Sequence, residues 1–270
     1  MIHKGPRRVA LLAPLFCLSI ICLYDDSSGA LSRQPQATLT AGSVIEREIG
    51  GDEQHVYLLP LTAGQFAHIV VEQSAVDAVL ALLKPDGQPS ADVNNYPLYE
   101  PEYLSLIAET DSAYQLKISA ADPKAARAKY KIRVEDWRAA TPRDSQFVDA
   151  ERKFSEATKL LRRGKVDSLP QAAAIYEAAL QRWRELGERR YEMKTLIYLG
   201  DVNVRLSKLQ RSIELCAQAL AIAREMGDRR FEGISLSSVG WGWHNLGEYQ
   251  KALEYYHSAL TIRQSLGIGR

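Results

Sequence analysis

The chain has few cysteines and no excess of charge of either sign. Its 270 residues include 3 cysteines, of which Cys17 and Cys22 lie near the N-terminus, and Cys216 alone remains beyond them. A single cysteine can form neither an internal disulfide nor a cysteine zinc cluster. The 34 Lys and Arg residues balance 33 Asp and Glu residues. This balance argues against a dedicated nucleic-acid-binding protein, which normally carries a marked basic excess.

Motifs for catalysis and for bound cofactors are also lacking. The sequence contains no His-Glu-x-x-His spacing, and its five histidines are scattered at positions 3, 55, 68, 244 and 257. It has neither a phosphate-binding Gly-x-x-x-x-Gly-Lys run nor a Gly-x-Ser-x-Gly nucleophile turn. These absences predict a non-enzymatic protein with no cofactor and no metal ion. From its place on a helical repeat, Cys216 is expected to be a small core residue rather than a nucleophile.

The one long apolar run lies at the N-terminus. Basic residues such as Lys4 and Arg7 precede the apolar stretch 9–23, and the small residues Ser28 and Ala30 follow it. This order predicts a signal peptide over residues 1–30, cleaved after Ala30, and therefore an exported protein, periplasmic or secreted. The alternative is an uncleaved membrane anchor, although a spanning helix needs about 20 apolar residues.

Residues 40–138 have the pattern of short strands. Tyr114, Leu116 and Ile118 alternate with polar residues, as they do on a half-buried strand. Such strands each bury one face and need a second sheet to cover it, so the region predicts a β-sandwich. A polar, tyrosine-rich stretch, 89–101, is expected to be a longer loop. The predicted strands lie within residues 56–59, 66–71, 79–83, 104–107, 114–118 and 130–134.

A linker is expected over residues 139–145. This stretch begins with small side chains, contains Pro142 and ends at Ser145, a suitable helix N-cap. Residues 146–270 are helical in pattern and repeat themselves with a period of forty. The array is therefore predicted to hold about three 40-residue helix hairpins. Two residue pairs each occur three times at this spacing. The first is Ala179-Leu180, Ala219-Leu220 and Ala259-Leu260, and the second is Leu186-Gly187, Met226-Gly227 and Leu266-Gly267.

The last unit is similar to the tetratricopeptide repeat (TPR). Val239 and Gly240 stand at the Leu-Gly pair of that repeat, and Ala252, Tyr256 and Ala259 at its small and aromatic positions. The 40-residue period resembles the arrays of bacterial proteins that end in a caspase-like CHAT protease domain. That domain, with its His/Cys pair, is not in this sequence.

The first half of the chain resembles the pre-peptidase C-terminal-type jelly-roll of exported bacterial proteins, on the stretches 61–66, 82–87 and 113–118. Together the two resemblances imply an α + β multidomain protein. An N-terminal β-sandwich of jelly-roll type is followed by an all-α TPR helical solenoid.

The TPR resemblance implies a groove that binds a peptide or protein partner, lined by the first helix of each hairpin. Trp241 is the most telling candidate, because Trp243 faces the partner helix and the two side chains cannot share a face. Paired arginines such as Arg229 and Arg230 follow acidic residues at helix ends, and a solvated structural role is expected for them. The positions transferred from the family are Lys194, Ile197, Asp201, Val204, Arg205, Ser237, Trp241, His244 and Asn245.

Three functions fit this organisation. The first is an exported protein–protein interaction scaffold that binds its partner in the TPR groove, with no role for nucleic acid. The second is the front, substrate-recruiting part of a larger CHAT-type cysteine protease whose catalytic domain is missing here. The third, motivated by Tyr96, Tyr99 and Tyr103, is a β-domain that binds a glycan or cell-wall polymer.

Overall fold

The computed structural model describes residues 37–95 and 100–267. All of them belong to one compact unit, Gln34–Arg270. The expected signal peptide, residues 1–30, lies outside the described residues. Among the described helices, none combines the length and the apolar character that crossing a membrane would require.

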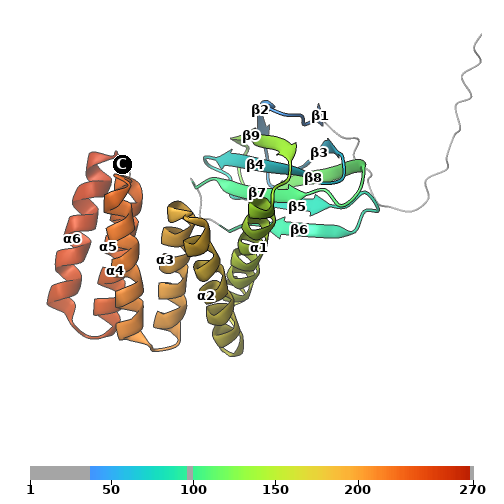
Figure 1. Cartoon of the computed structure of the whole chain (residues 1–270). Coiled ribbons are helices and arrows are strands. Elements are labelled where there is room, and N and C mark those ends of the chain that lie inside the picture. Colours follow the sequence, from blue (N-terminus) through green and yellow to red (C-terminus); the bar gives the residue numbers. More distant parts are fainter. Residues whose placement is uncertain (1–36, 96–99, 268–270) are drawn as a thin grey trace, which may run out of the picture. The chain divides into compact units, whose positions relative to one another are not determined.

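The N-terminal half forms two facing β-sheets (Figure 1). One sheet has the strand order β1-β3-β8-β5-β6 and the other β2-β9-β4-β7. The described strands are β1 (Ala37–Thr38), β2 (Val44–Ile49), β3 (Gln54–Leu61), β4 (Gln65–Gln73), β5 (Ala78–Leu83), β6 (Pro89–Val93), β7 (Glu102–Ile107), β8 (Ser112–Ala120) and β9 (Ala128–Ala139). Apart from the parallel β1–β3 pair, neighbouring strands are antiparallel.

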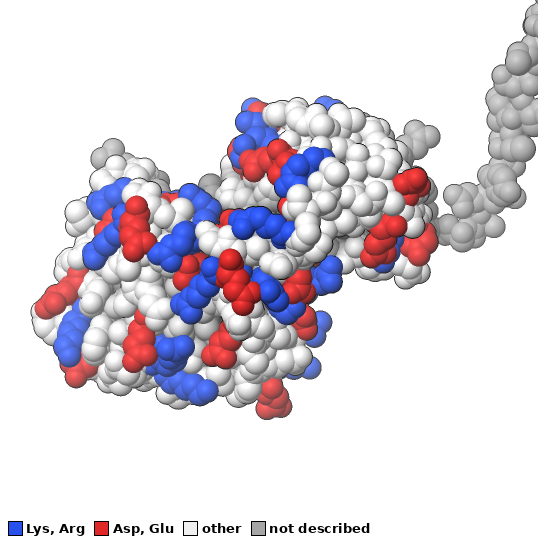
Figure 2. Space-filling model, in the orientation of Figure 1, with Lys and Arg blue, Asp and Glu red and all other residues white. Residues whose placement is uncertain are grey.

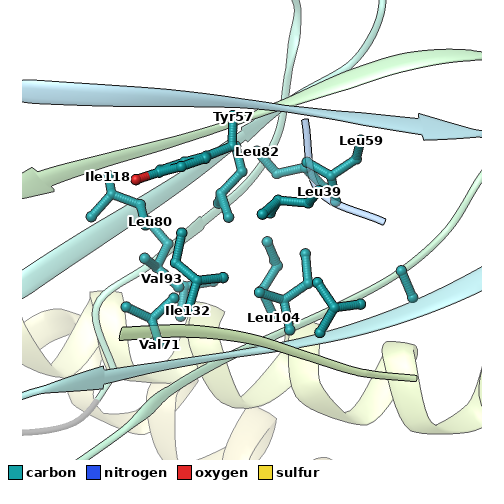
Figure 3. Close-up of a cluster of buried hydrophobic side chains, with 14 of the residues drawn as sticks. Leu39, Tyr57, Leu59, Val71, Leu80, Leu82, Val93, Leu104, Ile118 and Ile132 are labelled. Carbon is teal, nitrogen blue, oxygen red and sulfur yellow. The ribbon is translucent and has the colours of Figure 1, made fainter. Parts of the chain in front are cut away.

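Alternating side chains build the core between the two sheets. On β8, Tyr114, Leu116 and Ile118 are buried while the residues between them are only partly covered. Figure 3 shows side chains of the two sheets meeting, with Leu80 from one and Ile132 from the other. Each fully buried aliphatic side chain contributes about 1.5–3 kcal/mol, so this core holds the sheets face to face.

All six predicted strand segments lie within strands, but the predicted loop over 89–101 was wrong in its first part. Residues 89–93 form β6, which pairs with β5 so that Leu80 lies opposite Val93. The mainly exposed side chains of β6 gave no alternating apolar signal, because it is an edge strand. Tyr103, expected in the same loop region, lies in β7, whereas Tyr96 and Tyr99 lie outside the described residues.

The C-terminal half consists of helices packed in sequence order as hairpins (Figure 1). The hairpins pair α1 with α2, α3 with α4 and α5 with α6, which confirms three successive hairpins. The helices are α1 (Pro142–Arg162), α2 (Leu169–Leu186), α3 (Arg189–Arg205), α4 (Leu209–Glu225), α5 (Arg229–Asn245) and α6 (Tyr249–Ser265), with a short 3-10 turn, η1 (Val166–Ser168), before α2.

Small residues let paired helices approach closely. A methyl group added to Gly200 would lie 2.5 Å from Sγ of Cys216, and one added to Gly240 would lie 2.9 Å from a ring carbon of Tyr256. The two glycines are forty residues apart and each meets the second helix of its own hairpin. The forty-residue period of the sequence therefore corresponds to the same close contact between paired helices, repeated in two hairpins.

The junction between the two halves is shorter than predicted. β9 runs to Ala139, and α1 begins at Pro142 with Thr141 as its N-cap, so Ser145 is inside the helix. Thr141 and Asp144 form a capping box, in which the side chain of each accepts a hydrogen bond from the backbone N–H of the other. Arg138 of β9 donates to both carboxylate oxygens of Asp144, at 2.7 and 2.9 Å. The capping box and the ion pair with Arg138 both involve Asp144 and hold the start of α1 next to the end of β9. Only two residues, Ala140 and Thr141, therefore separate the strand from the helix.

Polar contacts also join the sandwich to the helices. The backbone N–H of Ser105 on β7 donates to Glu151 of α1 at 2.7 Å. The segment after β6 contributes Asn95, whose amide donates to Ser155 of α1 at 2.8 Å and whose carbonyl accepts from the Tyr198 hydroxyl of α3 at 2.6 Å. These contacts place β7 against α1, and Asn95 against both α1 and α3.

Candidate partner-binding groove

A groove of about 540 Å³ lies along α3 and α5, the first helices of the second and third hairpins. Most of its wall is apolar. We call it the α3–α5 groove and define it by its lining residues: Ile197, Asp201 and Val204 of α3; Ser212 and Cys216 of α4; Arg230, Gly233, Ile234, Ser237, Ser238 and Trp241 of α5; Arg263 and Leu266 at the end of α6.

Small residues on α5 create this opening. Gly233, Ser237 and Ser238 are three of the six α5 residues that line the groove, and they leave room where larger side chains would fill it. Gly233 also lets α6 approach, since a methyl group there would lie 3.3 Å from Ile262. The groove therefore arises from the residue choice on one helix and the hairpin packing behind it.

The structure brings together five of the nine sequence-predicted positions. Trp241 is 46% exposed, whereas Trp243 packs near the buried Ile213, Cys216 and Val239. The predicted separation of the two tryptophans onto different faces is therefore what the structure shows. The predicted positions that line the groove are Ile197, Asp201, Val204, Ser237 and Trp241.

Three further predicted residues lie beside the groove without lining it. His244 stacks on Trp241 with 5.7 Å between ring centroids and 9° between ring planes. The amide of Asn245 donates to the carbonyl of Trp241 at 2.7 Å. Arg205 pairs with Asp201 at 3.0 Å, one turn back along α3. These residues surround Trp241 and Asp201 at one end of the groove.

Lys194 differs from the prediction. Its side chain is 2% exposed, with Nζ 3.7 Å from a carboxylate oxygen of Glu100 and 4.6 Å from the centroid of the Tyr103 ring. Burial lowers the pKa of Lys194 to about 8, although the carboxylate of Glu100 opposes this shift. Lys194 cannot offer its ammonium to an outside partner, because the sandwich covers this part of α3. The sequence of the repeat alone does not predict that the sandwich buries this residue.

Sequence reasoning missed the basic residues at the other end of the groove. Arg230, expected to have only a solvated structural role, lies 3.0 Å from Glu100 and lines the groove. Arg263 lies in the last turn of α6 and Leu266 is its C-cap residue, whereas the predicted positions all came from the first helices of the hairpins. The fold brings them there because α6 runs antiparallel to α5 and ends beside the start of that helix.

Charges of both signs are mixed over the face of the helices seen in Figure 2. Two acidic residues at the start of α5 pair with arginines: Glu232 of its first turn pairs with Arg224 and Arg229, and the N-cap residue Asp228 pairs with Arg190. Among residues 37–95 and 100–267, no carboxylate pairs with Arg263. This arginine is thus a groove cation without a described counter-charge.

Cys216 has the expected place in the core. It is 1% exposed, and burial raises the pKa of its thiol to about 12, so the thiol is protonated at neutral pH. In the described part of the chain, no group of three or more His, Cys, Asp or Glu residues is arranged to hold a metal ion.

A second polar cluster lies under α1, and no residue pattern predicted it. Nδ1 of His68 and Oγ of Ser105 are 2.7 Å apart, on facing positions of β4 and β7. Burial raises the pKa of Glu151, which accepts from the Ser105 backbone. Tyr103 stacks on His68 on one side and contacts Tyr191 of α3 on the other. Tyr103 therefore packs between sheet and helices and is no part of a glycan-binding loop.

A family model described as tetratricopeptide repeat matches residues 191–265, which span α3 to α6. A search of curated protein sequences finds no match to this chain.

Solved structures give low-scoring similarities to both halves. The TPR domain of Arabidopsis FLU is 18% identical, covers 46% of this chain and 99% of its own, and has a TM-score of 0.41. The pre-peptidase C-terminal domain of Bacillus anthracis collagenase is 18% identical, covers 38% of this chain and 98% of its own, and has a TM-score of 0.32. Aeromonas hydrophila PliG, a periplasmic inhibitor of g-type lysozyme, is 12% identical, covers 37% and 93%, and has a TM-score of 0.30.

The described residues thus have a mixed α + β architecture, in which a sheet-rich region is followed by six helices of TPR-like solenoid. The repeat match over residues 191–265 indicates a scaffold for protein–protein interaction.

Proposed function

We propose that this protein binds a segment of another protein in the α3–α5 groove and acts as a scaffold outside the cytoplasm. The observation that carries the proposal is the groove itself, about 540 Å³ and mostly apolar, with the exposed ring of Trp241 in its wall. Large aromatic side chains at such sites supply contact area at low entropic cost and are enriched among residues that dominate binding energy. Export rests on the basic and apolar N-terminal residues alone.

The groove fits a protein segment better than it fits a reacting substrate. Its polar lining consists of serine hydroxyls, one carboxylate and two arginines, and the carboxylate of Asp201 already pairs with Arg205. The buried thiol of Cys216 is protonated, so it supplies no thiolate nucleophile. The groove therefore offers binding surface, and we propose no reaction for it.

Peptide selection tests the proposal. Residues 34–270 are immobilised and challenged with a phage-displayed library of random dodecapeptides, and the enriched peptides are synthesised and measured by fluorescence anisotropy. We expect Ser237→Arg, which fills the groove, and Trp241→Ala each to weaken binding at least about tenfold. His257→Ala, at an exposed position of α6 outside the groove, should bind as the parent does. Failure to enrich any peptide, or equal binding by all variants, would overturn the proposal.

Export has a separate test. Expression of the full chain in a bacterial host, followed by fractionation and mass determination, should yield a periplasmic product that begins after Ala30. A full-length product in the cytoplasmic fraction would contradict export and leave the groove binding unaffected.

A second candidate function is favoured by one observation on α6. Leu180 and Leu220 are 5% and 7% exposed, because the following hairpin covers them, whereas the equivalent Leu260 is 50% exposed. Such a face suits a further packed element, as expected for the front part of a larger CHAT-type protease. Reading the gene downstream of residue 270 tests this candidate, and a stop codon there would eliminate it.

A further inference from the structure

The two ends of the α3–α5 groove differ in chemistry. Arg230 lies at the start of α5, and Arg263 lies near the end of α6. The close approach of Gly233 to Ile262 shows that these helix ends are adjacent, so both guanidinium groups belong to the same end of the groove. Trp241 and Val204 come from the last turns of α5 and α3 and line the opposite end.

A carboxylate already occupies part of the basic end. Glu100, which precedes β7, is 4% exposed and lies 3.0 Å from Arg230 and 3.7 Å from Lys194. Glu102 adds a second negative charge that acts on Lys194. These two carboxylates lie by Lys194 and Arg230, whereas Arg263 has no carboxylate partner among the residues that the structure describes. The chain itself thus demonstrates that this end accepts an acidic side chain.

The rest of the groove offers no second centre of charge. Ile197 and Ile234 line it between the ends, and Asp201 is neutralised by Arg205. At the far end, the Trp241 ring is stacked on His244 and remains about half exposed. Apolar and aromatic side chains of a partner would therefore lose least solvation, and gain most contact, on this part of the wall.

The helix geometry sets the length of segment that fits. Trp241 follows Arg230 by eleven positions on α5, and a rise of 1.5 Å per residue separates them by about 16 Å along the axis. An extended chain advances about 3.3 Å per residue, so about five residues span the groove from end to end.

From this charge asymmetry and length we propose the partner class. The α3–α5 groove takes a short segment of another protein with an acidic side chain at the Arg263 end and apolar or aromatic side chains toward Trp241. Arg263 pairs with the acidic residue, and Glu100 of the chain holds the neighbouring basic pair. This inference rests on the proposed function and adds the sequence preference of the bound segment.

The experiment compares the peptides selected by two proteins that differ in one charge. Residues 34–270 and the same protein with Arg263→Glu are challenged with the random dodecapeptide library in parallel. We expect peptides from the parent protein to share an acidic residue about four or five positions from an aromatic or large apolar one. Arg263→Glu should select a basic residue in its place, and should bind the parent's peptides about tenfold more weakly.

The outcomes separate this inference from the function on which it rests. Peptides that need Trp241 but show no acidic preference, or whose charge preference survives Arg263→Glu, would overturn the inference and leave groove binding intact. Absence of any Trp241-dependent peptide would overturn both. Sedimentation velocity covers a third outcome, since a dimer that Trp241→Ala dissociates would mean that a second copy of the chain fills the groove, and this result would also overturn the inference.

Discussion

The same side of α3 and α5 is covered at one end and open at the other. At the covered end, Lys194 is buried beneath Glu100 and Tyr103 of the sandwich. At the open end, Trp241 is about half exposed, and Asp201 and Arg205 form an exposed pair. Both ends consist of positions that a repeat array exposes equally by its own periodicity. The sandwich therefore determines which part of the helical surface remains available to a partner.

The largest expected effect on the free energy of unfolding comes from a substitution at the covered end. Glu100→Lys removes the carboxylate between Lys194 and Arg230 and adds a third positive charge at a nearly inaccessible position. A buried charge left without its partner costs about 3–5 kcal/mol. Urea unfolding followed by tryptophan fluorescence should show a loss of that size.

The matched change at the open end is Asp201→Lys, which disrupts an exposed pair of side chains. Exposed ion pairs contribute about 0–1 kcal/mol, so this variant should unfold at nearly the parent's urea concentration. Equal losses in the two variants would mean that the covered end is no different in energy from the open one.

A smaller effect should appear in the pH dependence of stability at Lys194. Its pKa in the folded protein is about 8, against 10.5 for an unperturbed lysine. Between these values the unfolded chain binds more protons than the folded one, so stability rises with pH across this window. The free energy of unfolding of the parent, relative to Lys194→Met, should rise by on the order of 2 kcal/mol between pH 8 and 10.5. A flat difference would contradict burial of the ammonium.

The junction that holds the sandwich on α1 should give the next effect. Asp144→Asn removes the charge from a capping box and from the pair with Arg138. The loss should be about 1–2 kcal/mol at pH 7. Arg138 and the hydrogen bonds from Thr141 hold the pKa of Asp144 well below the unperturbed value of 3.8.

That pKa shift sets the pH range of the effect. The stabilisation by Asp144 is complete above the unfolded pKa and declines as the pH falls below 3.8 toward the folded pKa. The difference between parent and Asp144→Asn should therefore shrink below about pH 4. Asp149→Asn, which affects only an exposed i,i+4 pair with Lys153, is the control and should cost under about 0.5 kcal/mol. A pH-independent difference would assign the effect to lost packing instead of charge.

The smallest effect on stability is expected at Trp241 itself. Trp241→Ala removes a ring that is about half exposed and stacks on His244. Surface substitutions of this kind change stability by about 0.5 kcal/mol or less, while binding of the selected peptides should weaken at least about tenfold. A large drop in the thermal midpoint, measured by circular dichroism, would show that the ring supports the fold and would weaken its use as a binding probe.

Several features could be predicted from residue patterns because their causes are local. The forty-residue period places Gly200 and Gly240 at matching helix contacts, and helical spacing puts Trp241 and Trp243 on different faces. The alternation of apolar and polar residues likewise predicted β8 as a strand. These patterns depend on the geometry of one helix or one strand, which each segment carries within itself.

Other features depended on contacts between distant segments. β6 is a strand because β5 offers it an edge, and α1 begins at Pro142 because Arg138 and Thr141 both engage Asp144. Lys194 is buried because Glu100 approaches from the sandwich, ninety-four positions earlier in the chain. The residue pattern around Glu100 and the residue pattern of α3 do not predict this contact.

Residue patterns were thus enough to predict a strand region, a helical region, three helix hairpins and the outward direction of Trp241. Two further features came from the packing of the sandwich and the helices: the sandwich covers one end of α3 and α5, and Arg230, Arg263 and Leu266 line the α3–α5 groove. The two kinds of feature differ in the sequence distance between the residues that cause them. A side-chain pattern within one element fixes which face of that element is apolar. The packing of whole elements decides which faces meet and which remain exposed to solvent.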